Sequence, residues 1–171
     1  MGEFEWPWEY NFPPFFTIQP HEQTREHQLK VWKDLVLNYQ KHQKEAILTV
    51  NNNTPLFCND AIKRQLNTDA RLQVLEALQK SGNAAPVANK VRWEIYWYTL
   101  DDWADKIYTW VTNCGLNNTV CTLYEITNGD NSTGEEFYGL DQDVLRKALA
   151  KLQEKRKCEL FDDESGGVKF F

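Results

Sequence analysis

Apolar residues recur at three- and four-residue steps in several stretches of the chain, which is the pattern of a helix with one buried face. Four main helices are predicted: over about 23–43, from the N-cap Thr68 to Gly82, from about Leu100 to Gly115, and onward from the N-cap Asp141. In the third of these, Trp103, Ile107, Trp110 and Cys114 line the apolar face. Two brief helices are predicted as well, from the cap Asn59 through Leu66 and over 124–127.

Short apolar runs between these helices predict strands. Single strands are expected at 46–50 and 120–123. Two hairpins are expected, one of 84–87 with 91–98 around Asn89-Lys90, and one of 158–161 with 168–171 across 162–167. In the first hairpin, alternation places Trp93, Ile95 and Trp97 on one face.

The order helix, strand, helix, helix, hairpin therefore occurs twice, and it is the order of a winged-helix domain. We predict an α+β fold of two tandem winged-helix domains, at 23–98 and 99–171, preceded by a docking segment at 1–22. The first segment carries Pro7, Pro13, Pro14 and Pro20, which lack backbone donors and disfavour helix, so we expect it to be extended.

Aromatic residues are concentrated at the N-terminus. The chain has 7 Trp, 7 Tyr and 9 Phe, and the first sixteen residues hold Phe4, Trp6, Trp8, Tyr10, Phe12, Phe15 and Phe16. Ordering sixteen residues costs on the order of 20 kcal/mol, and burying seven aromatic rings at ~1.5–3 kcal/mol each returns a similar amount only if nearly all are covered. Two hypotheses follow. Either several rings enter a groove on another chain, which Pro13-Pro14 would favour by pre-organising the backbone, or the segment folds back onto the first domain.

The formal net charge of −6 argues against a protein that coats nucleic acid or an anionic membrane. Residues 24–98 are the basic part of the chain, with eleven bases and seven acids, and the last predicted helix carries a basic set in which Arg146, Lys147 and Lys151 are accompanied by Lys155, Arg156 and Lys157. This set is typical of a solvated helix face, of a contact with an acidic protein or, as the alternative function, of a winged-helix nucleic-acid binder. The corresponding helix of the first repeat has Arg71 and Lys80 balanced by Asp69 and Glu76.

The sequence carries no recognisable catalytic or cofactor-binding motif, and we predict a protein without enzymatic activity, cofactor, metal or small-molecule substrate. His21, His27 and His42 lie around the first helix without a nucleophile signature, which is typical of solvated histidines. Cys58, Cys114, Cys121 and Cys158 are scattered without zinc-binding spacing and are interpreted as reduced, packed thiols. No apolar stretch approaches the length of a membrane span, so we expect a cytoplasmic protein that reaches membranes only through partners.

Several segments together resemble one family, the small subunits of the ESCRT-II endosomal sorting complex. The resemblance runs over essentially the whole chain and rests on Phe4-Glu5-Trp6-Pro7-Trp8-Glu9-Tyr10, Phe12-Pro13-Pro14-Phe15-Phe16, Thr122-Leu123-Tyr124-Glu125 with Asn128-Gly129, Glu136-Phe137 before Gly139-Leu140, and Gly167-Val168-Lys169-Phe170-Phe171. It implies two tandem winged helices and two larger winged-helix subunits as partners. It also implies that proline-aromatic motifs hold this subunit to them.

Those motifs correspond here to Pro13-Pro14-Phe15-Phe16 and to Pro7-Trp8-Glu9-Tyr10, where Trp8 replaces a proline. The predicted partner-binding residues are Trp6, Pro7, Trp8, Tyr10, Phe12, Pro13, Pro14, Phe15 and Phe16, with Arg146, Lys147 and Lys151 for a second partner. By resemblance, the second winged helix recruits and activates an ESCRT-III subunit during multivesicular-body sorting of ubiquitinated cargo at endosomal membranes. Our hypothesis for the three basic residues is that they attract an acidic helix of that partner.

Overall fold

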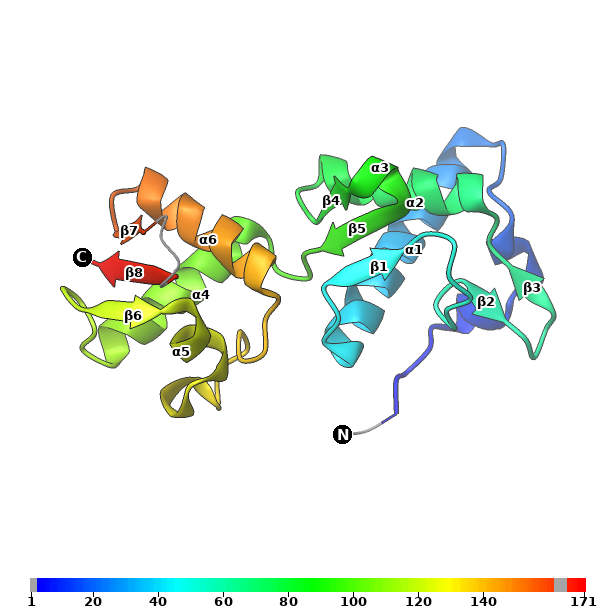
Figure 1. Cartoon of the computed structure of the whole chain (residues 1–171). Coiled ribbons are helices and arrows are strands. Elements are labelled where there is room, and N and C mark those ends of the chain that lie inside the picture. Colours follow the sequence, from blue (N-terminus) through cyan, green and yellow to red (C-terminus); the bar gives the residue numbers. More distant parts are fainter. Residues whose placement is uncertain (1–2, 162–165) are drawn as a thin grey trace. The chain divides into compact units, whose positions relative to one another are not determined.

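The computed structural model describes residues 3–161 and 166–171, and the chain divides into two compact units, Met1–Trp97 and Tyr98–Phe171 (Figure 1). Both units combine helices with a small antiparallel sheet, so the predicted mixed α+β class is confirmed. The predicted turn of the last hairpin at 162–165 lies outside the described residues.

The first unit is built on the long helix α1 and a three-stranded sheet. Its elements are η1 (Trp8–Asn11), η2 (Pro13–Phe16), α1 (Glu22–Gln43), β1 (Ile47–Thr49), β2 (Cys58–Asn59), β3 (Arg64–Gln65), α2 (Thr68–Lys80), β4 (Ala84–Val87), α3 (Ala88–Val91) and β5 (Arg92–Ile95). The sheet order is β1-β5-β4, and the central Trp93 lies opposite Leu48 on one side and Pro86 on the other. Trp93 is fully buried, which places the core between this sheet and the helices.

Local chemistry sets the ends of these elements. The His21 ring accepts from the Thr24 backbone and caps α1, which ends at Lys44 with a φ of 54° in the left-handed region. Helix α2 is capped by Asn67, one residue before the predicted cap Thr68. The segment α3 is a left-handed turn rather than a true helix, because Ala88, Asn89 and Lys90 have φ values of 49°, 56° and 62°. It joins β4 to β5, and Trp97 lies beyond the end of the strand that was predicted to contain it.

The helix predicted from Asn59 to Leu66 is wrong, because this stretch is the short hairpin β2–β3. Asn59 caps only a turn, since its side-chain oxygen accepts from the Ala61 amide. Its amide nitrogen donates to the Tyr10 carbonyl at 2.7 Å instead. The hairpin closes where the Leu66 amide donates to the Phe57 carbonyl, and Leu66 is fully buried. In the first unit, the predicted element order is therefore wrong at this one brief element, whereas the helix, strand, helix and terminal hairpin around it are present.

Arg71, one of the two basic residues balanced by Asp69 and Glu76 on the helix of the first repeat, is buried on α2. Its Nε donates to the Leu66 carbonyl at 2.7 Å, and its Nη1 donates to the carbonyls of Val50 and Asn52. The guanidinium also lies 5.0 Å from the centre of the Phe57 ring. A buried cation is tolerated when hydrogen bonds replace its hydration, so Arg71 ties α2 to the loop before the hairpin. It presents no charge for a nucleic acid.

The N-terminal segment is extended only in part, at positions such as Pro7, Phe12 and Thr17. Two 3₁₀ turns, η1 and η2, shorten it, and proline occupies the first positions of η2, where a helix needs no backbone donor. The turns fold the segment back onto α1 and the hairpin, so the second of the two hypotheses describes the structure. Tyr10, Phe15 and Phe16 join the core of the first unit, and Phe4 and Trp6 pack partly buried against it.

Tyr10 connects this segment to the loop before β2. Its hydroxyl lies 2.5 Å from the Pro55 carbonyl and 3.1 Å from the Cys58 carbonyl, and its ring stacks on Trp6 at 3.9 Å. Burial raises the pKa of the Tyr10 phenol to about 12, with smaller contributions from the nearby Cys58, Tyr39 and Asp60. The folded unit therefore favours the neutral phenol of Tyr10 over the phenolate.

The second unit follows the predicted order of elements. It consists of α4 (Leu100–Asn113), β6 (Val120–Thr122), α5 (Leu123–Asn128), η3 (Asp130–Ser132), α6 (Gln142–Glu154), β7 (Cys158–Leu160) and β8 (Gly167–Phe170), with sheet order β6-β8-β7. Thr99 and Asp102 form a capping box at the start of α4, and Asp141 caps α6 as predicted. Cys114 is exposed at the end of α4, so its predicted place on the apolar face is wrong. All four cysteines are free thiols, and Cys121 and Cys158 are buried.

We predict that Phe15→Ala destabilises the chain by about 3–5 kcal/mol, the cost of removing a large ring from a packed core. The Phe15 ring is 4% exposed and stacks on Trp32 with ring centres 4.3 Å apart. Trp8→Ala is the matched control, because that ring is 70% exposed and its loss should change stability by less than about 0.5 kcal/mol. Urea unfolding followed by circular dichroism measures both. Equal stabilities for the two variants would contradict the buried position of Phe15.

Alkaline pH should weaken the folded chain through Tyr10. An unfolded tyrosine ionises near pH 10, whereas in the folded chain burial raises the pKa of Tyr10 to about 12. The folded state therefore holds this proton more tightly, and stability falls as the pH rises from about 10 to about 12. Tyr10→Phe removes the titrating group, so its unfolding free energy should decline less over this range than that of the parent chain. Parallel declines in urea unfolding across this range would contradict the assignment.

Candidate functional site

The N-terminal segment leaves two large rings outside the core of the first unit. Trp8 is 70% exposed and Phe12 is 47% exposed, and their ring centres lie 5.7 Å apart. Pro13 and Pro14 are exposed beside them. An exposed pair of aromatic rings next to two prolines is the type of surface that proteins use to bind other proteins.

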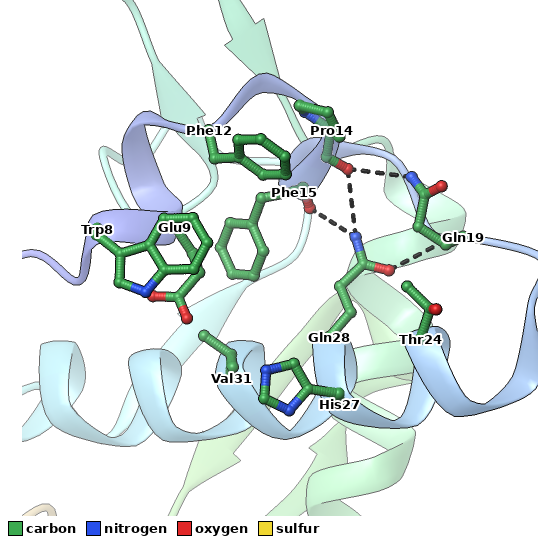
Figure 2. A pocket seen from close by; sticks show the side chains of 10 residues that line it. All are labelled: Trp8, Glu9, Phe12, Pro14, Phe15, Gln19, Thr24, His27, Gln28 and Val31. Carbon is green, nitrogen blue, oxygen red and sulfur yellow. Dashed lines mark hydrogen bonds between the residues drawn. The ribbon is translucent and has the colours of Figure 1, made fainter.

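These rings border a groove of about 370 Å³ between the segment and α1. Figure 2 shows Trp8, Phe12 and Phe15 on the side of the segment, with Val31 and His27 on α1. The groove is largely apolar, and Glu9, Gln19, Thr24, His27 and Gln28 supply the polar groups around it. Its shape and lining suit an apolar side chain of a partner better than a small polar substrate.

Gln28 on α1 holds the segment in place. Its amide nitrogen donates to the carbonyls of Phe15 at 2.9 Å and Thr17 at 2.8 Å, and its oxygen accepts from the Gln19 amide at 3.0 Å. Figure 2 shows this amide directed from α1 toward the segment. The Trp32 indole, one turn further along α1, also donates to the Phe15 carbonyl at 3.0 Å. The buried polar groups are therefore satisfied, and the groove is preformed.

Gln28 is not among the residues predicted from the sequence, because only apolar residues were assigned to the inner face of this helix. The available signal was spacing: Gln28 lies four residues before Trp32, so both side chains project from the same face of a helix. A glutamine on a buried helix face needs partners for its amide, and non-helical backbone nearby supplies them.

The predicted partner-binding residues of the segment separate into three groups. Trp8, Phe12, Pro13 and Pro14 are exposed; Trp6 and Pro7 are partly buried; and Tyr10, Phe15 and Phe16 are buried in the unit's own core. The structure thus does not bring all nine to one surface. Phe15 and Phe16, which are predicted to bind a partner, could enter a partner's pocket only by leaving Trp32 and their own core.

The three predicted basic residues of the second unit lie on α6. Arg146 and Lys147 are exposed and Lys151 is partly exposed, so all three can meet a partner. The opposite face of the helix, with Val144, Leu145, Ala148, Leu149 and Leu152, is buried in the core. The acidic residues Asp143 and Glu154 are exposed on the same helix and reduce the positive potential.

The histidines have structural surroundings. His21 caps α1, His27 lies at the edge of the groove, and the His42 ring meets Phe4 edge-on with centres 5.4 Å apart.

None of the helices in the described ranges 3–161 and 166–171 is long and apolar enough to span a bilayer.

Comparisons with known proteins agree with one another. A family model described as ESCRT-II complex subunit matches residues 9–141. The chain is 50% identical to vacuolar protein-sorting-associated protein 25 of Drosophila melanogaster, over 100% of both chains, and 44% identical to its Homo sapiens counterpart, over 98% of both.

Solved structures show the same similarity in three dimensions. The crystal structure of subunit VPS25 of the endosomal trafficking complex ESCRT-II matches with a TM-score of 0.88 at 28% identity, covering 96% of this chain and 98% of that one. A chain from the crystal structure of endosomal complex ESCRT-II (VPS22/VPS25/VPS36) matches with a TM-score of 0.85 at 29% identity, with the same coverage. With the family model covering most of the sequence and curated relatives matching all of it, this chain belongs to the family of ESCRT-II complex subunits.

Proposed function

We propose that this chain is a non-enzymatic subunit of an ESCRT-II complex that sorts ubiquitinated membrane cargo into multivesicular bodies. Its relatives are named as vacuolar sorting proteins and match it over their full length, and the related solved complex contains VPS22 and VPS36 beside VPS25. The surface described above presents apolar rings rather than paired acid and base groups, which favours binding over catalysis. In this proposal the chain works in the cytoplasm and reaches endosomal membranes through its complex.

The N-terminal segment and the first unit dock on the larger ESCRT-II subunits. The observation that carries this step is the exposed pair Trp8 and Phe12 beside an apolar groove. A tryptophan exposed on a rigid support is the kind of residue that dominates the binding energy of an interface. Burying its large ring is favourable and costs little conformational entropy. Pro13 and Pro14 lie next to the pair and limit the entropy lost on docking.

The buried members of the motif have a different role in this mechanism. Tyr10, Phe15 and Phe16 fix the segment on its own unit, so the docking surface is ordered before a partner arrives. Trp6 and Pro7, which are partly buried, support the same turn. The partner therefore meets the exposed face of the proline-aromatic motifs, and it need not extract their anchored rings.

The second unit recruits an ESCRT-III subunit and holds it ready for assembly. Arg146, Lys147 and Lys151 would attract an acidic helix of that subunit, since they lie on one exposed side of α6 over a fully packed core. Holding a subunit in place requires no bond chemistry. Activation in this scheme is a matter of position and local concentration.

The double variant Trp8→Ala, Phe12→Ala should remain folded but should no longer co-purify with the two larger subunits. Both rings lie mostly outside the core, so their loss removes binding energy with little effect on stability. Co-expression of the three subunits with a tag on a larger subunit measures the interaction, and thermal unfolding checks the fold.

Val91→Ser is the control for this experiment, because Val91 is 42% exposed in the same unit but does not line the groove. It should co-purify like the parent chain. A double variant that still co-purifies at the parent level would refute docking through this face.

Reversing the charges of α6 with Arg146→Glu, Lys147→Glu and Lys151→Glu should abolish binding to the ESCRT-III subunit, because the acidic partner would then be repelled. Surface plasmon resonance with the full chain provides the affinity. The same reversals at the exposed Lys44, Lys63 and Lys80 change the net charge equally and should leave binding within about threefold. Unchanged affinity in the α6 variant would show that these three residues do not carry recruitment.

A further inference from the structure

The groove beside the N-terminal segment contains a carboxylate for which the proposed function does not account. Glu9 lines this groove together with Trp8 and Phe12, and it is partly buried even in the free chain. It follows Trp8 in the turn η1, and Figure 2 shows its carboxylate at the same end of the groove as the Trp8 indole. A carboxylate and an exposed aromatic ring therefore share this end of the groove.

No cation of the chain pairs with Glu9. Among the residues that the structure describes, its side chain forms no ion pair and no hydrogen bond. His27 lines the same groove from α1, but these two side chains are not paired. Residues 3–20 contain Glu3, Glu5 and Glu9 and no lysine or arginine. The groove of the free chain therefore presents a carboxylate without a counter-charge.

Docking through Trp8 and Phe12 would bury this carboxylate. A partner that covers both rings also covers the groove that they border, and Glu9 is part of the wall of that groove. Removing an unpaired carboxylate from water is costly, whereas a cation placed against it offsets much of that cost. A tight complex through this face therefore needs a positive charge from the partner. This inference rests on the proposed docking function.

The surroundings of Glu9 favour arginine as the source of that charge. The Trp8 ring is mostly exposed, so a planar guanidinium can stack on it. The same group can donate two parallel hydrogen bonds to the Glu9 carboxylate, a geometry that the ammonium group of lysine lacks. Phe12, Pro14 and Val31 provide accessible apolar walls that can cover the methylene stem and a neighbouring aliphatic side chain.

We propose that the larger subunits insert an arginine into this groove, next to an aliphatic residue of the same segment. The guanidinium lies against the Trp8 ring and pairs with Glu9, and the aliphatic side chain fills the apolar part between Phe12 and Val31. The partner's segment is thus defined by adjacent basic and aliphatic side chains. Acidic and purely apolar segments are disfavoured, because they would leave Glu9 buried without a counter-charge.

Isothermal titration calorimetry of the full chain against the purified pair of larger subunits tests this proposal. Glu9→Gln keeps the shape of the side chain but removes its charge, so it should bind at least about tenfold more weakly, because the partner's arginine is then buried unpaired. A partner without a cation predicts the opposite sign, since a neutral amide costs less to bury than a carboxylate. Glu9→Gln that binds as tightly as the parent chain, or more tightly, would therefore overturn the proposal.

Glu5→Gln is the matched control, because Glu5 is an exposed carboxylate of the same segment that does not line the groove. It makes the same change in net charge and should bind within about twofold of the parent chain. Equal weakening in both variants would mean that the charge of the segment acts at long range, and it would refute a direct pair with Glu9. Thermal unfolding checks that both variants keep the parent's fold.

Phenylglyoxal, which modifies arginine side chains, identifies the residue of the partner. In the assembled complex, one arginine of the larger subunits should be protected from the reagent, and mass spectrometry should find less protection when the chain carries Glu9→Gln. A complex in which no arginine gains protection would refute the assignment.

The docking proposal and the arginine proposal can fail separately in the same titrations. If Trp8→Ala, Phe12→Ala loses binding while Glu9→Gln binds like the parent chain, docking stands and the arginine is refuted. If the double variant binds like the parent chain, both are refuted, because the arginine requires the Trp8 ring.

Discussion

The hydrogen-bonded stack of Phe15 on Trp32 is the interaction on which the candidate docking surface depends. The two rings lie parallel, and the indole of Trp32 and the amide of Gln28 both donate to the Phe15 carbonyl. A segment rich in proline lacks the backbone donors that would hold it in a sheet or helix. Side chains of α1 supply those donors instead. The attachment fixes the turn that carries the exposed Phe12, Pro13 and Pro14.

In the proposed function, one short sequence thereby serves both the core of its own unit and docking. Five of the seven rings of the proline-aromatic segment turn inward, where they complete a core that would otherwise be small for a domain of this size. The others, Trp8 and Phe12, remain outside because the 3₁₀ turns direct them away from α1. Folding therefore bears the ordering cost of the segment before binding begins. A docking element that is already ordered loses little conformational entropy when its partner arrives.

Burial determines whether a charged residue of this chain contributes to the surface potential. Arginine is usually a surface residue, yet Arg71 lies inside the first unit with carbonyl oxygens around it. In the second unit, α6 exposes the basic Arg146 and Lys147, whereas α4 exposes the acidic Asp101, Asp102 and Asp105. The net charge of the whole chain conceals this separation.

The sequence by itself determined the main helices, most strands and the winged-helix order of the second unit. Those elements are predictable because their signals are local: apolar periodicity in α1, α2, α4 and α6, and capping residues such as Asp141. The sequence also indicated that the N-terminal aromatic residues form a segment separate from the two predicted domains. Tertiary structure decided which of these rings are buried. Their burial depends on contacts with Gln28 and Trp32, which are distant in sequence, and no local pattern specifies such contacts. It likewise converted the predicted helix at 59–66 into a hairpin, since Asn59 gains more from the Tyr10 carbonyl and Leu66 from the core than a short isolated helix would supply. Local pattern fixes the long helices, but not the short elements such as the hairpin at 58–65. Contacts between remote side chains fix which faces remain exposed for binding.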